Sequence, residues 1–136
     1  MPWFAFIHPI LAVATLLYGL GVGQVSLSKL GDWDFPLRRL RRRSFFFFVF
    51  CVGNLLLGLF VNLQLRSQGR GVALTAHLPI AIGACVASGL AVLATFSPGK
   101  PGEIPPLLRW HPILLVVTLG LMLTNGFLVI LKLVKF

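Results

Sequence analysis

Apolar residues follow one another in four long stretches of the chain, with polar segments between them. The stretches cover residues 3–25, 44–63, 72–96 and 110–131. Each has about the 20 residues that a helix needs to cross a bilayer. The segment SPGKPGEIPP between the last two has four prolines and two glycines, so no helix continues through it. The pattern predicts an all-α polytopic membrane protein, an antiparallel four-helix transmembrane bundle formed by a single domain over residues 1–136.

Composition supports the same class of protein. Only 11% of the residues are charged, whereas soluble domains carry roughly 25%. The net charge of +9 would also suit a nucleic-acid-binding protein, but here Lys and Arg cluster between the apolar stretches, as they do in the cytoplasmic loops of membrane proteins. We therefore expect a lipid bilayer as the partner and no nucleic acid. The first stretch lacks a basic leader and a cleavage site, so we expect no cleavable signal peptide.

The distribution of basic residues predicts an orientation. Four spans place both termini on one side of the membrane, here called the terminal end, and the opposite side is called the basic end. The basic end holds Lys29, Arg38, Arg39, Arg41, Arg42, Arg43, Lys100 and Arg109, and the terminal end holds Arg66, Arg70, Lys132 and Lys135. The positive-inside rule places the basic end in the cytoplasm or stroma and both termini on the non-cytoplasmic side. The alternative interpretation of RRLRRR is a site for anionic lipid or an acidic partner.

Small and polar residues recur at helical spacing in each stretch, which predicts the faces that point into the bundle. The four stripes are His8, Ala12, Thr15, Gly19 and Gly23; Cys51, Asn54, Gly58 and Asn62; His77, Ala81, Ala84 and Ser88; and His111, Leu115, Thr118 and Met122 with Asn125 or Gly126. Helix packing alone explains such stripes, and their asparagines are expected to hydrogen-bond between helices. The two cysteines, Cys51 and Cys85, are expected to be unpaired.

Histidines stand near the start of three stretches, and two of them open the same phrase, HPIL, at residues 8–11 and 111–114. His8 and His77 each lie about five residues into a stretch from the terminal end, so both should be about 8 Å deep on parallel helices. Two such imidazoles can ligate one haem iron, as in b-type cytochromes. Arg66 and Arg70 could then pair with the haem propionates. Two independent histidines with separate hydrogen bonds, or a bound pigment such as chlorophyll or a carotenoid, are the alternatives.

The third histidine, His111, belongs to the basic end and is a weak ligand candidate. A second haem there would need a partner at the start of the second stretch, where the sequence has Ser44. Pro9 and Pro112 suit the first turn of a helix, so the HP phrase is partly a helix-start signal.

Three segments carry a resemblance to a known family: FIHPILAVATLLYGLGVG, TAHLPIAIGACVASGLAVLATF and WHPILLVVTLGLMLTNGFLVI. They resemble the four-helix membrane family numbered 4079 among domains of unknown function, found in cyanobacteria and plastids. That family is similar to the core of cytochrome b-561 type proteins, which carry two haems and move electrons across membranes. The resemblance implies that His8 and His77 match the family's histidines at the terminal end and His111 one at the basic end. It also implies photosynthesis, in a thylakoid or plasma membrane.

The chain departs from that family at the start of the second stretch. The family has a histidine there, and this sequence reads Arg43-Ser44-Phe45. The resemblance therefore implies one haem more firmly than two.

These observations favour a b-type-cytochrome-like protein that binds one haem between the first and third spans and transfers electrons. The alternative is a non-catalytic accessory subunit of a photosynthetic or respiratory membrane complex, binding lipid or pigment through surfaces such as the aromatic run FFFFVF. A transporter is less favoured, because no span has a charged residue at mid-membrane. Hydrolysis is not expected, since the three acids, Asp32, Asp34 and Glu103, lie in loops away from His8 and His77.

Overall fold

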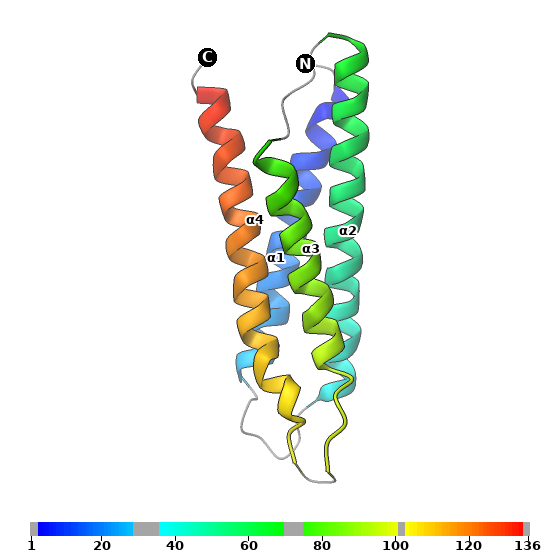
Figure 1. Cartoon of the computed structure of the whole chain (residues 1–136), viewed down its shortest axis with the longest axis vertical. Helices are drawn as coiled ribbons and strands as arrows, with labels where there is room; N and C mark the ends of the chain where they lie inside the picture. Colours follow the sequence, from blue (N-terminus) through cyan, green and yellow to red (C-terminus); the bar gives the residue numbers. More distant parts are fainter. Residues whose placement is uncertain (1–2, 29–35, 70–74, 101–102, 135–136) are drawn as a thin grey trace.

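Four long helices form an antiparallel bundle in the computed structural model, which describes residues 3–28, 36–69, 75–100 and 103–134 (Figure 1). Their bounds are α1 (Ile7–Ser28), α2 (Leu37–Ser67), α3 (His77–Ala94) and α4 (His111–Val134), with short 3-10 helices η1 (Trp3–Phe6) and η2 (Pro106–Trp110) leading into α1 and α4. All four long helices are long and apolar enough to cross a membrane. The predicted fold class is confirmed.

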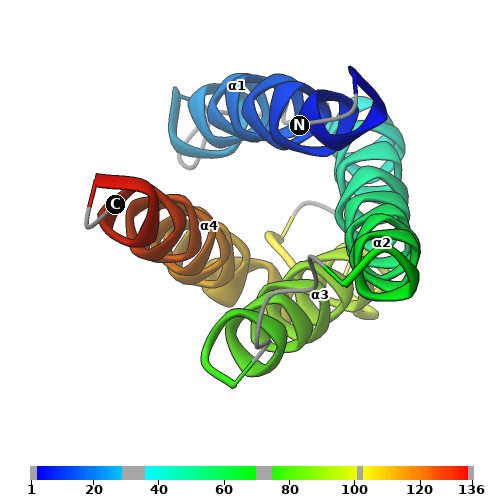
Figure 2. The same ribbon diagram turned by 90° about the horizontal axis from the view of Figure 1, so that it is seen from above.

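The helices follow one another around the bundle axis in chain order, so α1 lies diagonally opposite α3 (Figure 2). α1 begins and α4 ends at the same end of the bundle, the upper end of Figure 1. This is the terminal end as the sequence defined it. α1 and α3 therefore run parallel to each other, and α2 and α4 run in the opposite direction.

The observed helices differ from the predicted stretches mainly at α2. The second stretch was expected to begin at residue 44, yet α2 begins at Leu37 and includes the arginine cluster that was expected in a loop. Arginine and leucine are good helix formers, and Leu40 inside the cluster is fully buried in the core. With 31 residues α2 is about 46 Å long, longer than the roughly 30 Å hydrocarbon layer. Helix α2 thus begins about two turns before the predicted stretch, and these turns carry the arginine cluster.

Arg41 joins this extension of α2 to the end of α3. One guanidinium nitrogen, Nη2, donates a hydrogen bond of 2.7 Å to the carbonyl of Thr95, which caps the C-terminus of α3. The guanidinium also lies 4.1 Å from the centroid of the Phe96 ring. A cation is favourable at the C-terminus of a helix, where backbone carbonyls lack partners, so Arg41 is a structural residue and differs from its exposed neighbours Arg39 and Arg42.

The tightly packed core lies in the basic half of the bundle. Its buried members are Val22, Leu40, Phe47, Cys51, Leu108 and Leu115. Gly19 explains how α1 approaches so closely, because a Cβ atom there would lie 2.5 Å from Cε2 of Phe47 and 2.9 Å from Cδ2 of Leu119. A small residue at a helix contact has the same role in other membrane bundles. Cys51 and Cys85 are both free, as predicted.

Large apolar side chains cover the outside of the bundle. Exposed examples occur on all four helices and include Leu17, Phe60, Leu93 and Phe127. Water-soluble proteins rarely expose apolar surface on this scale. The outside therefore fits the hydrocarbon of a bilayer, and the chain is an integral membrane protein.

Candidate cofactor site

His8 and His77 meet across the bundle at the terminal end. His8 is the second residue of α1 and His77 is the first residue of α3. Their ring centroids are 6.2 Å apart, and the ring planes are inclined by 78°. The predicted matched position on parallel helices is therefore observed. Both residues lie in the first helical turn, however, and not five residues inside a helix as the hydropathy pattern suggested.

Proline explains why both helices begin where they do. Pro9 and Pro79 each stand at the third position of their helix. The first four N–H groups of a helix have no partner within it, so a residue without N–H is tolerated there. The prolines thus hold His8 and His77 at helix starts.

The ring of His8 packs directly on the backbone of α2 at Gly58. A Cβ atom at Gly58 would lie 2.9 Å from Cε1, 3.1 Å from Nε2 and 3.4 Å from Nδ1 of His8. Nδ1 of His8 is buried and has no hydrogen-bond partner among the described residues. A buried polar atom without a partner is unusual in a folded protein. The His8 side chain is thus held in place by packing, and its Nδ1 atom can still accept or donate a hydrogen bond or bind a metal ion.

The separation of the two rings suits a shared metal. A metal–imidazole bond of about 2.0–2.1 Å and a ring radius of about 1.2 Å place the centroids of two opposed ligands about 6.5 Å apart. The observed 6.2 Å is within a few tenths of an ångström of this value, and it also suits an ordinary edge-to-face contact between rings. Among the described residues no group of three or more His, Cys, Asp or Glu is placed to hold a metal ion. A porphyrin supplies its own four nitrogens and needs from the protein only the axial ligands.

Helices α1 and α4 contribute few buried residues at the terminal end, although α2 buries residues there. In α1 no residue from Ile7 to Ala14 is buried, and in α4 none from Leu119 to Leu131 is buried. α1 and α4 cross in the basic half and separate toward the terminal end in Figure 1. Two further buried oxygens, Oδ1 of Asn54 and Oδ1 of Asn125, lack hydrogen-bond partners within the described part of the chain. Helices α1 and α4 are therefore packed less closely at the terminal end than at the basic end.

Asn54 makes one of the interhelical contacts that the sequence predicted. Its Nδ2 donates to the hydroxyl of Thr15 on α1, and that hydroxyl donates in turn to the carbonyl of Leu11 at 2.8 Å. Asn62 is buried on the same helix. These side chains face the bundle interior, as expected for polar groups in a membrane helix.

His111 lies in a different environment at the basic end. It is fully buried, with Nδ1 2.9 Å from the hydroxyl of Ser26 and Nε2 2.8 Å from the hydroxyl of Ser44. Both ring nitrogens are therefore occupied, and the side chain links α1, α2 and α4. The sequence pointed to Ser44 as the residue opposite His111, but it gave no sign of Ser26. A serine near the end of a span carries no distinctive signal.

The two arginines considered as partners of a cofactor are resolved unequally. Arg66 is exposed in the last turn of α2, two turns beyond Gly58 and about 12 Å from it along the helix axis. Arg70 lies outside the described residues. Arg66 is at the same end of the bundle as His8 and His77, so it lies at the correct end to meet an acidic group beside them.

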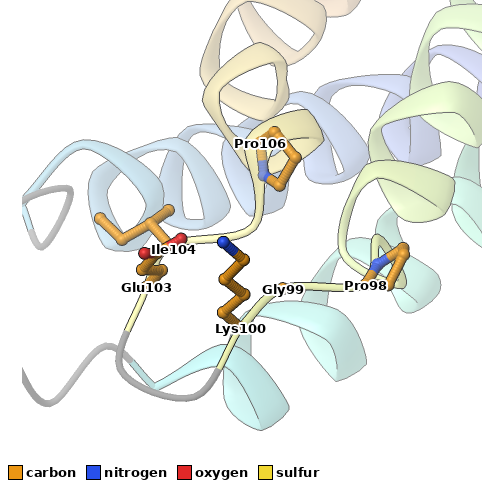
Figure 3. A pocket seen from close by; sticks show the side chains of 6 residues that line it. All are labelled: Pro98, Gly99, Lys100, Glu103, Ile104 and Pro106. Carbon is orange, nitrogen blue, oxygen red and sulfur yellow. The ribbon is translucent and has the colours of Figure 1, made fainter.

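A hollow lies at the basic end, between α3 and η2 (Figure 3). It has a volume of about 390 Å³, and Lys100 extends into it beside Ile104 and Pro106. Its lining offers Lys100 and Glu103 as the only charged side chains, and the hollow is far from His8 and His77. It does not add catalytic groups to the histidine pair.

Comparisons of the chain with protein-family models, with curated proteins and with solved structures found no match. The resemblance to the family numbered 4079 therefore stays a prediction.

Proposed function

We propose that the protein is an integral membrane, b-type-cytochrome-like electron-transfer protein with one haem held between α1 and α3. The observation that carries the proposal is the meeting of the His8 and His77 rings at 6.2 Å across the bundle diagonal. Haem, when bound, supplies one-electron redox chemistry at its iron.

Each residue near the pair has a role in this proposal. His8 and His77 would hold the haem, and each would give the iron one ring nitrogen. Gly58 leaves room for the His8 ring against α2, where any side chain would displace it. Arg66 offers a guanidinium that can pair with an acidic group of a cofactor. Arg70 has the same proposed role from the sequence alone.

His111 is left out of this ligand set. Its two nitrogens already bond to the hydroxyls of Ser26 and Ser44. The proposal therefore has one haem at the terminal end and none at the basic end.

The absorption spectrum of the purified protein tests the proposal. The chain is expressed with a haem supply, purified in detergent and reduced with dithionite. We expect the bands of a six-coordinate b haem, and we expect His8→Gly or His77→Gly to remove them. His111→Gln is the matched control, because it changes a buried histidine that is not a proposed ligand, and its bands should remain.

Imidazole addition separates ligand loss from misfolding. Exogenous imidazole should restore the bands of His8→Gly, since the free base can occupy the vacated ligand position. A protein that elutes as a folded particle yet stays colourless, or bands that survive both substitutions, would overturn the proposal. Chlorophyll or carotenoid bands in place of haem bands would favour the accessory-subunit alternative.

The outward-facing phenylalanines favour that second function. Phe45, Phe46 and Phe50 of the run FFFFVF are exposed, whereas Phe47 is buried in the core and Phe48 packs beside Gly89. The aromatic run is therefore divided between the core and the lipid-facing surface. Its exposed part suits a partner helix or a pigment in a larger membrane complex.

The orientation belongs to the same proposal. Arg38, Arg39, Arg42, Lys100 and Arg109 are all exposed at the basic end. The positive-inside rule then places that end in the cytoplasm or stroma and the termini on the other side, and the family resemblance implies a photosynthetic membrane. Reporter fusions at the C-terminus test this orientation. We expect a reporter that is active only outside the cytoplasm to be active at the C-terminus, and activity of a reporter that works only in the cytoplasm would contradict the orientation.

A further inference from the structure

A narrow groove runs between α1 and α4 in the basic half of the bundle, remote from His8 and His77. It has a volume of about 240 Å³ and is lined by Leu20, Gly23, Gln24, Leu27, Pro112, Leu115, Val116 and Leu119. Seven of these eight residues are apolar. On α1 the lining covers seven residue steps, so the groove is about 10 Å long.

The groove is open toward the surface that faces lipid. Leu20, Leu27 and Val116 on its edges are all exposed, and Leu115 beneath them is fully buried. A Cβ atom built on Gly23 would meet nothing within 4 Å. The glycine thus leaves a depression that no side chain of the described chain fills.

A basic residue stands at one end of this groove. Pro112, Val116 and Leu119 form its α4 wall at spacings of four and three residues. Arg109 lies three residues before Pro112, in η2, and is exposed. No ion pair involving Arg109 is found within the described part of the chain.

The neighbouring residue Trp110 is exposed as well. Tryptophan beside arginine at the end of a span is typical of the headgroup level of a membrane. The basic end of the groove is thus followed, one turn before Pro112 along the chain, by an exposed cation.

We propose that this groove binds one acyl chain of an anionic phospholipid whose phosphate is held by Arg109. The apolar walls match the acyl chain. The guanidinium, which has no ion pair among the described residues, matches the phosphate, to which it can donate two hydrogen bonds. The exposed arginines at the start of α2 raise the positive potential of this end and so favour anionic over zwitterionic lipid. The site is independent of the histidine pair.

Quenching of Trp110 fluorescence by brominated lipids tests the site. Trp3→Phe and Trp33→Phe leave Trp110 as the only tryptophan, and this parent protein is reconstituted in vesicles with brominated phosphatidylglycerol or brominated phosphatidylcholine. We expect phosphatidylglycerol to compete for the position beside Trp110 about fivefold better than phosphatidylcholine. This ratio corresponds to the free energy that one basic residue contributes near an anionic headgroup. Arg109→Gln should bring the two lipids to equal quenching.

Gly23→Leu tests the groove itself, and Gly21→Leu is the matched control. Both glycines lie on α1, and at both a Cβ atom would meet nothing within 4 Å. Leucine at position 23 fills the groove and should remove the preference for phosphatidylglycerol, whereas leucine at position 21 should keep it. Equal quenching by the two lipids in the parent protein would overturn the proposal. So would a preference that survives in Gly23→Leu or disappears in Gly21→Leu while both variants remain folded in detergent.

Discussion

Replacing His111 by leucine tests whether this histidine is a packing residue. The substitution keeps a side chain of similar size but removes both ring nitrogens. The hydroxyls of Ser26 and Ser44, each 1% exposed, then lose hydrogen bonds of 2.9 and 2.8 Å. Side-chain hydrogen bonds between membrane helices contribute about 0.6–1.7 kcal/mol each, so the loss should be about 1–3 kcal/mol. This is about a 5- to 150-fold change in the unfolding equilibrium constant.

The matched variant removes all three polar groups together. In Ser26→Ala/Ser44→Ala/His111→Leu no hydroxyl is left without a partner, so the free energy of unfolding should recover to within about 1 kcal/mol of the parent value. Both variants are measured by unfolding in mixed micelles, through titration with a denaturing detergent or by steric trapping.

Two results would refute the reasoning. If His111→Leu were as stable as the parent, or if the triple variant stayed as unstable as the single one, the serine hydrogen bonds would not account for His111. If His111→Leu instead kept its stability and lost the haem bands, His111 would be a ligand.

Three further predictions use the same unfolding assay. Gly19→Leu should destabilise the bundle by about 1–3 kcal/mol, because the new side chain overlaps atoms of α2 and α4, whereas Gly120→Leu should have little effect, since a Cβ there meets nothing within 4 Å; equal losses would contradict the packing. Arg41→Gln should lower the free energy of unfolding by about 1–2 kcal/mol through loss of the cap on α3 and the ring contact, and the exposed Arg42→Gln should not. Asn54→Leu should lower the free energy of unfolding by only about 0.6 kcal/mol, because the hydroxyl of Thr15, which accepts the hydrogen bond from Asn54, still donates to the backbone of its own helix. A loss above about 2 kcal/mol would show that Asn54 has a role beyond these contacts.

The arginine cluster and the histidines show different limits of prediction from sequence. The sequence placed Arg38–Arg43 in a loop, because hydropathy indicates which residues lie in hydrocarbon and not where a helix begins or ends. A helix can continue into the headgroup region. The sequence placed His8 and His77 at one end because the number and direction of spans determine which helix starts share a side. The sequence did not determine whether the two rings point toward each other. Helical periodicity predicts which residues share a stripe on one helix, but not how two helices are rotated relative to each other.

The sequence by itself determined that the chain crosses a membrane four times, that most polar residues of its four stripes face inward, and that its positive charge gathers at one end. These follow from the free energy of transferring side chains and unpaired backbone groups into hydrocarbon, which depends on residue type alone. Only the tertiary structure decided that His8 meets His77 over Gly58, that Ser26 and Ser44 occupy both nitrogens of His111, and that Gly23 opens a groove beside Pro112. Those contacts depend on the rotation and separation of packed helices, which are set by the fit of many side chains at once and not by any local pattern.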